Sequence, residues 1–123
     1  MNLVMIGRFT DAGAAASAKE IIDKLTEHVR DESQAGEIEI GGHHIDRFSE
    51  RMLNLLRELE IYDVSPVELE QFGYDFDVKV DGDKVVLTTD ESDVSAFLKV
   101  LIDKGARVEV YSAHNYPDTA HGR

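Results

Sequence analysis

The stretch Asp75-Phe76-Asp77-Val78-Lys79-Val80-Asp81-Gly82-Asp83-Lys84-Val85-Val86-Leu87 decides the fold of this 123-residue chain. Apolar residues alternate with polar ones on both sides of Gly82, namely Phe76, Val78 and Val80 before it and Val85 and Leu87 after it. A period of two that is interrupted by a glycine-containing turn predicts a β-hairpin with one buried face and one solvated face.

The register of this hairpin stays open at the level of the sequence. A turn at Asp81-Gly82 pairs Val85 with Val78, whereas a turn at Gly82-Asp83 pairs Val85 with Val80. Both turns keep the apolar side chains on one face, so the hydrophobic pattern does not choose between them.

Hydrophobic periodicity assigns the segments around the hairpin. It predicts strands at 3–6 and 108–110, helices over 11–30, 45–60 and 94–104, and a short helix at 66–71. The Ser65-Pro66-Val67-Glu68 sequence supports the short helix, because it combines a capping box with proline at the first helical position. Residues 37–40 alternate in a way that is typical of a short edge strand.

This order of elements predicts an α+β fold. When an inserted helical segment around 45–71 is left out, the remaining strands and helices follow the order of the ferredoxin-like split β-α-β. This fold is a four-stranded antiparallel sheet with helices on one face. We expect strands 3–6 and 76–80 to be neighbours in its centre. The inserted helix should bury its apolar stripe against the sheet edge or a second subunit. Residues 1–113 are expected to form a single domain, and residues 114–123 a loosely ordered tail.

Composition narrows the class of protein. Hydrophobic residues make up 42% and charged residues 31% of the chain, which is ordinary for a globular domain. The absence of cysteine excludes disulfides and thiolate metal sites, and is typical of a reducing compartment. No signal peptide or membrane-spanning run is evident, so we expect a cytoplasmic protein that does not bind membranes.

Acidic residues are concentrated in one part of the chain. Twelve acidic residues and two lysines lie between positions 58 and 93, which gives this segment a charge of −10 against −12 for the whole chain. Such a surface disfavours direct nucleic-acid binding and favours a basic protein partner. The carboxylates expected to bind this partner are those of the short helix and the hairpin: Glu68, Glu70, Asp75, Asp77, Asp81 and Asp83.

The sequence contains no clear motif for binding a metal ion or a nucleotide cofactor. His43-His44-Ile45-Asp46 contains three candidate metal ligands, His43, His44 and Asp46, but adjacent side chains on a helix diverge by about 100° and do not converge on one ion. Neither a Gly-x-Gly-x-x-Gly motif nor a Walker lysine is present. We therefore expect no bound metal and no cofactor.

Two segments carry a resemblance to a known family. Asn2-Leu3-Val4-Met5-Ile6-Gly7-Arg8-Phe9 and Val110-Tyr111-Ser112-Ala113-His114 resemble a family of small bacterial proteins of unassigned function. The resemblance implies no activity, no cofactor and no site.

The acidic segment favours a non-catalytic interaction module, such as an inhibitor or a nucleic-acid mimic that docks on a basic surface of a nucleic-acid-handling protein. The alternative is a small ligand-binding or enzymatic domain, homodimeric through its sheet or inserted helix, with a pocket between sheet and helices near Tyr74, Tyr111 and His114. A third hypothesis is a metal-dependent enzyme that uses His43, His44 and Asp46.

Overall fold

The computed structural model describes residues 2–34, 48–90 and 94–112 of the chain. In chain order the elements are β1 (Asn2–Arg8), α1 (Ala12–Gln34), α2 (Glu50–Leu59), the 3-10 helix η1 (Val67–Gly73), β2 (Asp77–Asp81), β3 (Lys84–Asp90), α3 (Ser95–Asp103) and β4 (Arg107–Ser112). The α+β class is confirmed, and every strand and helix predicted within the described residues is present. The predicted strand at 37–40 and the predicted tail at 114–123 lie outside the described residues.

The four strands form one antiparallel sheet in the order β2-β3-β1-β4. The prediction that β1 is a central strand is correct, but the prediction that β2 lies beside it is wrong, because β3 separates them. Charge explains this order. β3 carries no charged residue between its two ends, whereas β2 carries Asp77, Lys79 and Asp81, and charged side chains suit an edge strand.

The structure also determines the hairpin register. Val80 pairs with Val85 and Asp81 pairs with Lys84, as the Gly82-Asp83 turn requires. Gly82 has φ of 62°, and Asp83 is not among the residues with positive φ. Positive φ at the first central position alone is typical of a type II′ turn, which places glycine there.

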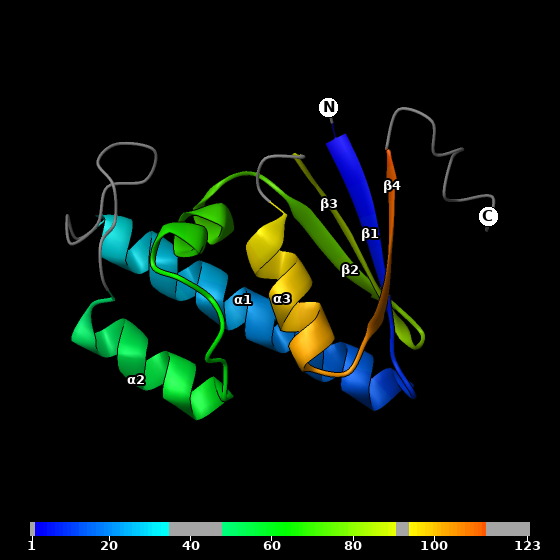
Figure 1. The fold of residues 1–123 in the computed structure, drawn as a ribbon, viewed down its shortest axis with the longest axis horizontal. Helices are drawn as coiled ribbons and strands as arrows, with labels where there is room; N and C mark the ends of the chain where they lie inside the picture. The colour runs from blue at the N-terminus through cyan, green and yellow to red at the C-terminus, as the bar shows by residue number, and fades with distance from the viewer. Residues whose placement is uncertain (1, 35–47, 91–93, 113–123) are drawn as a thin grey trace.

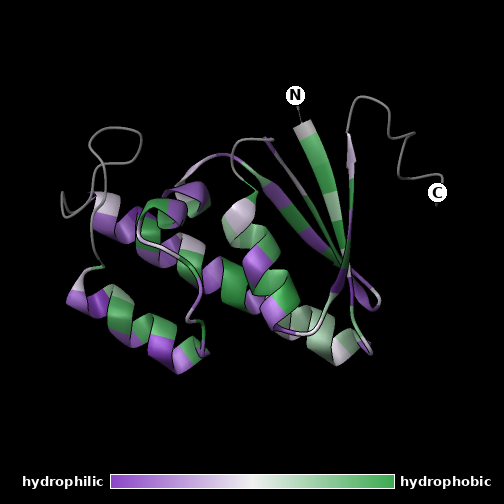
Figure 2. Cartoon of the chain, in the orientation of Figure 1, coloured by the Kyte–Doolittle hydropathy of each residue, from purple (hydrophilic) through white to green (hydrophobic). Residues whose placement is uncertain are grey.

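Helices cover one face of the sheet (Figure 1). α1 runs under β2 and β3 and buries Ala15, Ala18 and Ile22 completely. α3 packs on β1 and β4, and a Cβ on Gly7 of β1 would lie only 3.3 Å from the Leu101 side chain of α3. Figure 2 shows the hydrophobic stretch along β1 and the alternation of hydrophilic and hydrophobic residues along β2.

The inserted helix α2 differs from its prediction in two ways. It begins at Glu50 rather than at residue 45, because the Ser49 side chain caps it by accepting a hydrogen bond from the Met52 backbone N–H at 3.0 Å. Its stripe, with Met52 and Leu56 at 1% and 5% exposure, joins the common core beside α1. The prediction that the sheet edge or a second subunit covers this stripe is therefore wrong.

Three aromatic rings form the centre of the core. The Phe97 ring lies 4.9 Å from that of Phe72, in an edge-to-face arrangement, and 4.7 Å from that of Phe76, in a tilted one, both measured between centroids. Phe72 and Phe97 are fully buried. These contacts join η1, α3 and the residue before β2, so the inserted segment is part of the core of the domain.

Within the described residues, no helix combines the length and the apolar character that crossing a bilayer requires.

Candidate functional site

Four of the predicted partner-binding carboxylates lie along the edge strand. Asp75 precedes β2, Asp77 and Asp81 are its first and last residues, and Asp83 lies in the turn to β3. All four residues are exposed, and none of the four carboxylates forms a hydrogen bond or ion pair with another described residue. They are therefore available to solvent and to a partner.

Two lysines lie among these carboxylates. Lys79 stands between Asp77 and Asp81 and projects from the same side of β2, because side chains on a strand alternate. Lys84 lies directly across from Asp81 on β3. The hairpin therefore presents an alternation of charges on its solvated face rather than a continuous row of carboxylates.

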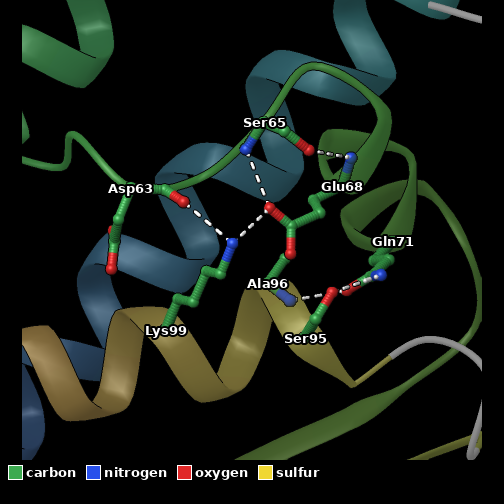
Figure 3. A network of polar contacts seen from close by, with 7 residues as sticks. All are labelled: Asp63, Ser65, Glu68, Gln71, Ser95, Ala96 and Lys99. Atoms are coloured by element: carbon green, nitrogen blue, oxygen red, sulfur yellow. Dashed lines mark hydrogen bonds and ion pairs between the residues drawn. The ribbon is translucent and has the colours of Figure 1, made fainter.

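Glu68 on η1 has a different environment (Figure 3). Its carboxylate accepts a hydrogen bond from the Ser65 backbone N–H at 2.8 Å, while the Glu68 N–H donates to the Ser65 hydroxyl at 3.4 Å. This reciprocal pair is the predicted capping box. The same carboxylate oxygen also accepts from Lys99 Nζ at 2.8 Å, and Lys99 donates to the Asp63 carbonyl at 2.9 Å. The network ties the inserted segment to α3.

The Glu68 carboxyl is strongly acidic in this network. Partial burial raises its pKa, but hydrogen bonds from Lys99, Ser95 and Ser65 outweigh that effect and lower the pKa from 4.5 to about 2. The Glu68 side chain is only 14% exposed, and its charge is matched by Lys99. Its carboxylate is therefore occupied within the fold.

Gln71 completes the junction between η1 and α3. Its side-chain oxygen accepts a hydrogen bond from the Ala96 backbone N–H at 2.7 Å, and its amide group donates to the Ser95 hydroxyl at 3.0 Å. The residue before α3, Val94, provides no side-chain cap. Gln71 thus caps α3 from 25 residues away, and no local sequence signal identifies such a long-range cap.

The six predicted carboxylates do not form one patch. Glu70 lies on η1 with Glu68 and accepts a hydrogen bond from the Tyr74 hydroxyl at 3.3 Å. Figure 1 shows η1 at one end of β2 and the turn with Asp83 at the other end. The acidic segment of the sequence is therefore divided between the helical side of the domain and the edge of the sheet.

The predicted pocket residues lie on different sides of the sheet. Tyr74 contacts η1 through Glu70, on the side that the helices cover. Tyr111 pairs with Val4, whose neighbour Met5 faces the helical core, so Tyr111 and Val4 face the opposite side. His114 lies outside the described residues. The structure thus does not bring the two tyrosines together between sheet and helices.

The candidate metal ligands His43, His44 and Asp46 also lie outside the described residues. Within residues 2–34, 48–90 and 94–112, no group of three or more histidine, cysteine or acidic side chains is arranged to hold a metal ion.

The sequence matches a known protein family. A family model described as a family of unknown function, DUF6375, matches residues 1–123. The chain belongs to this family. The resemblance to a family of unassigned function is thereby confirmed, and it extends over the whole chain rather than two segments. Searches of curated proteins and of solved structures find no match.

One buried polar cluster of this DUF6375 chain was missed by the sequence analysis. The Glu32 carboxylate, 2% exposed, accepts a hydrogen bond from the Ser49 hydroxyl at 2.5 Å and lies 3.0 Å from His28 Nε2. Because Ser49 also caps α2, the cluster joins the C-terminal half of α1 to the start of α2. The i,i+4 spacing of His28 and Glu32 was the available signal, but it resembles that of an ordinary surface pair.

Proposed function

We propose that the protein is a non-catalytic interaction module that presents the exposed carboxylates of Asp75, Asp77, Asp81 and Asp83 to a basic surface of a protein partner. A nucleic-acid-handling protein inhibited by such a module is one fitting partner, because its lysine and arginine side chains are already arranged to meet negative charge. Glu68 has no part in this surface, since Lys99 already neutralises it.

The observation that carries the proposal is the position of these four carboxylates. They are exposed, they form no ion pair with other described residues, and they lie on an edge strand. A net charge of −12 adds a long-range field that speeds the encounter with a basic protein. The cysteine-free composition supports a cytoplasmic setting.

We also propose that the chain has the topology of the ferredoxin-like split β-α-β. Its support is the antiparallel order with β1 and β3 in the centre, β2 and β4 at the edges, and α1 and α3 as the crossovers.

The test compares two variants of equal charge. In the edge variant, Asp75, Asp77, Asp81 and Asp83 become asparagine. In the control variant, four exposed acidic residues elsewhere are neutralised, namely Glu27→Gln, Asp31→Asn, Glu58→Gln and Asp63→Asn. Both variants change the net charge from −12 to −8. Each is immobilised and exposed to native extract at low and high salt, and captured proteins are identified by mass spectrometry.

We expect the parent and the control variant to capture the same basic proteins at low salt, and the edge variant to lose them. With a captured protein, the edge variant should associate more slowly than the parent, because it lacks the four carboxylates that attract the basic partner. The association rate of the parent should also fall as salt is added, because exposed charges are screened beyond about 8–10 Å at physiological ionic strength. Equal losses in the two variants would show that net charge alone is responsible, and the proposal would then be wrong.

A further inference from the structure

The two edges of the sheet differ in charge and in exposed apolar surface. The β2 edge presents the four carboxylates described above, whereas β4 carries one basic and one acidic residue, Arg107 and Glu109. Val110 of β4 is 50% exposed, and Ile102 of α3, which packs on β4, is 55% exposed. Among the described elements, none lies beyond β4 (Figure 1). An exposed edge strand with apolar side chains and no net charge is a template for pairing with another strand.

The backbone of β4 carries hydrogen-bonding groups that point away from the sheet. The two residues that flank the two-residue turn between β2 and β3 form a hydrogen-bonded pair, and such pairs alternate along antiparallel strands. The odd-numbered residues of β1 therefore bond to β3, in keeping with the hydrogen bond of 2.9 Å from the Phe9 N–H to the Asp83 carbonyl. Val108 and Val110 pair with odd-numbered residues of β1, so their own N–H and C=O groups point outward.

The charged groups at this edge are only partly matched within one copy. Nε and Nη2 of Arg8 both lie 3.0 Å from Oε1 of Glu109. The other carboxylate oxygen, Oε2, has no hydrogen bond or ion pair with another described residue, and the same is true of the exposed Arg107 side chain. Arg107 also pairs directly with Arg8, which is a repulsive contact. A second carboxylate beside Arg107 would therefore be stabilising.

We propose that β4 pairs antiparallel with β4 of a second copy, which makes one continuous sheet in a homodimer. The twofold axis is perpendicular to the sheet at Val108, which faces Val108 of the other copy. Arg107 of each copy then lies directly opposite Glu109 of the other, so the four charges alternate around a square and like charges lie only on its diagonals. A register centred on Glu109 would set two carboxylates opposite each other, and one centred on Val110 would separate Arg107 from Glu109. The charges therefore favour the register centred on Val108.

The position of α3 favours a second copy over an isolated extended peptide. Because α3 lies over β1 and β4, this symmetry sets the two α3 helices about two strand spacings apart, roughly 10 Å, which is close to the distance between packed helices. Ile102 lies about 200° around the helix from the fully buried Val100, so it is on the flank turned away from the core. A second copy brings a helix to this flank as well as a strand to the edge, whereas a peptide covers the strand alone.

The distribution of charge also permits this contact. The segment between positions 58 and 93 carries −10 of the total charge of −12, and its exposed carboxylates on β2 lie at the opposite edge of the sheet. Pairing through β4 keeps the two acidic edges at the far ends of the combined sheet, where their repulsion is weakest. Only residues 106–110 of each copy pair, so we expect a dissociation constant on the order of 10 μM.

The test reverses the charges at the junction. Arg107→Glu places two carboxylates at each contact, and Glu109→Arg places two arginines there. Each variant alone should dimerise at least about 10-fold more weakly than the parent in sedimentation equilibrium. An equimolar mixture should restore dimers, because both contacts of the heterodimer then pair opposite charges. Arg30→Glu and Glu27→Arg make the same charge changes at exposed positions of α1 and should leave dimerisation unchanged.

Amide hydrogen exchange tests the backbone pairing. Exchange of the Val108 amide should slow as the concentration of the parent rises and the dimer forms. The amides of Arg107 and Glu109 bond to β1 and should exchange slowly at every concentration, which provides an internal control.

Recovery in the mixture would exclude misfolding as the cause of the loss. A parent that stays monomeric up to about 100 μM would overturn the proposal. So would charge variants that dimerise as the parent does, or a Val108 amide that exchanges rapidly in the dimer. The inference is independent of the proposed function, since molecular mass and exchange test the β4 edge and capture of a basic protein tests the β2 edge. Failure of one result therefore leaves the other intact.

Discussion

The junction between η1 and α3 allows a quantitative prediction about stability. Glu68→Gln removes the negative charge but keeps an oxygen that can accept from the Ser65 N–H, and Lys99→Met removes the positive charge but keeps most of the aliphatic stem. Together with the double variant they form a double-mutant cycle, which isolates the Glu68–Lys99 interaction from other contacts. Both single variants should lower the free energy of unfolding.

The magnitude follows from the pKa of Glu68. A fall from 4.5 to about 2 corresponds to about 3.4 kcal/mol as an upper bound. Lys99 is 38% exposed, so solvent screening reduces the effect, and we expect Glu68→Gln to cost about 1–2 kcal/mol at pH 7. The coupling energy of the cycle should be about 1 kcal/mol.

The dependence on pH has a defined sign. Because folding lowers the pKa of Glu68, its contribution is complete above the unfolded value of 4.5 and is lost as pH falls toward about 2. About two-fifths of the difference between parent and Glu68→Gln should therefore disappear between pH 7 and pH 3.5. Urea unfolding followed by circular dichroism at the two pH values measures this difference, and the other carboxylates cancel in the comparison. A difference that stays constant between pH 7 and pH 3.5 would refute the reasoning.

Two further predictions concern the core and the α1–α2 junction. Phe97→Ala should cost about 3–5 kcal/mol in denaturant titration, because the ring is fully buried against Phe72 and Phe76, and a loss below about 1 kcal/mol would contradict its central position. Ser49→Ala should cost about 2–3 kcal/mol, because it removes the cap of α2 and a hydrogen bond to the buried Glu32. Ser65→Ala, which removes an exposed cap, should cost less in the same assay.

The sequence predicted the elements of the fold well because their signals are local. Periods of two and about 3.6 residues identify strands and helices, and the Ser65–Glu68 capping box was read correctly. The neighbours of β1 were predicted wrongly, although the charges of β2 and the uncharged interior of β3 held the needed signal. The difference in charge between these two strands can be read from the sequence alone.

The environment of individual carboxylates was less predictable. Lys99 lies 31 residues from Glu68 and Gln71 lies 25 residues from Ala96, so these contacts depend on how η1 docks on α3. The same is true of Glu32 and Ser49, which are 17 residues apart. A run of acidic residues in a sequence therefore does not reveal which of them are exposed, since tertiary packing decides that.

Lys79 provides the sharpest test of the proposed acidic edge. A surface that imitates a phosphate backbone needs successive negative charges, and Lys79 interrupts them between Asp77 and Asp81 on β2. If the exposed carboxylates of this edge bind a basic partner, the lysine opposes that binding, because its charge repels basic side chains. The Lys79→Glu variant should therefore strengthen the capture of basic proteins at low salt, whereas Arg30→Glu, which makes the same change of charge on the exposed side of α1, should have a smaller effect. Equal gains in the two variants would show that net charge alone is responsible.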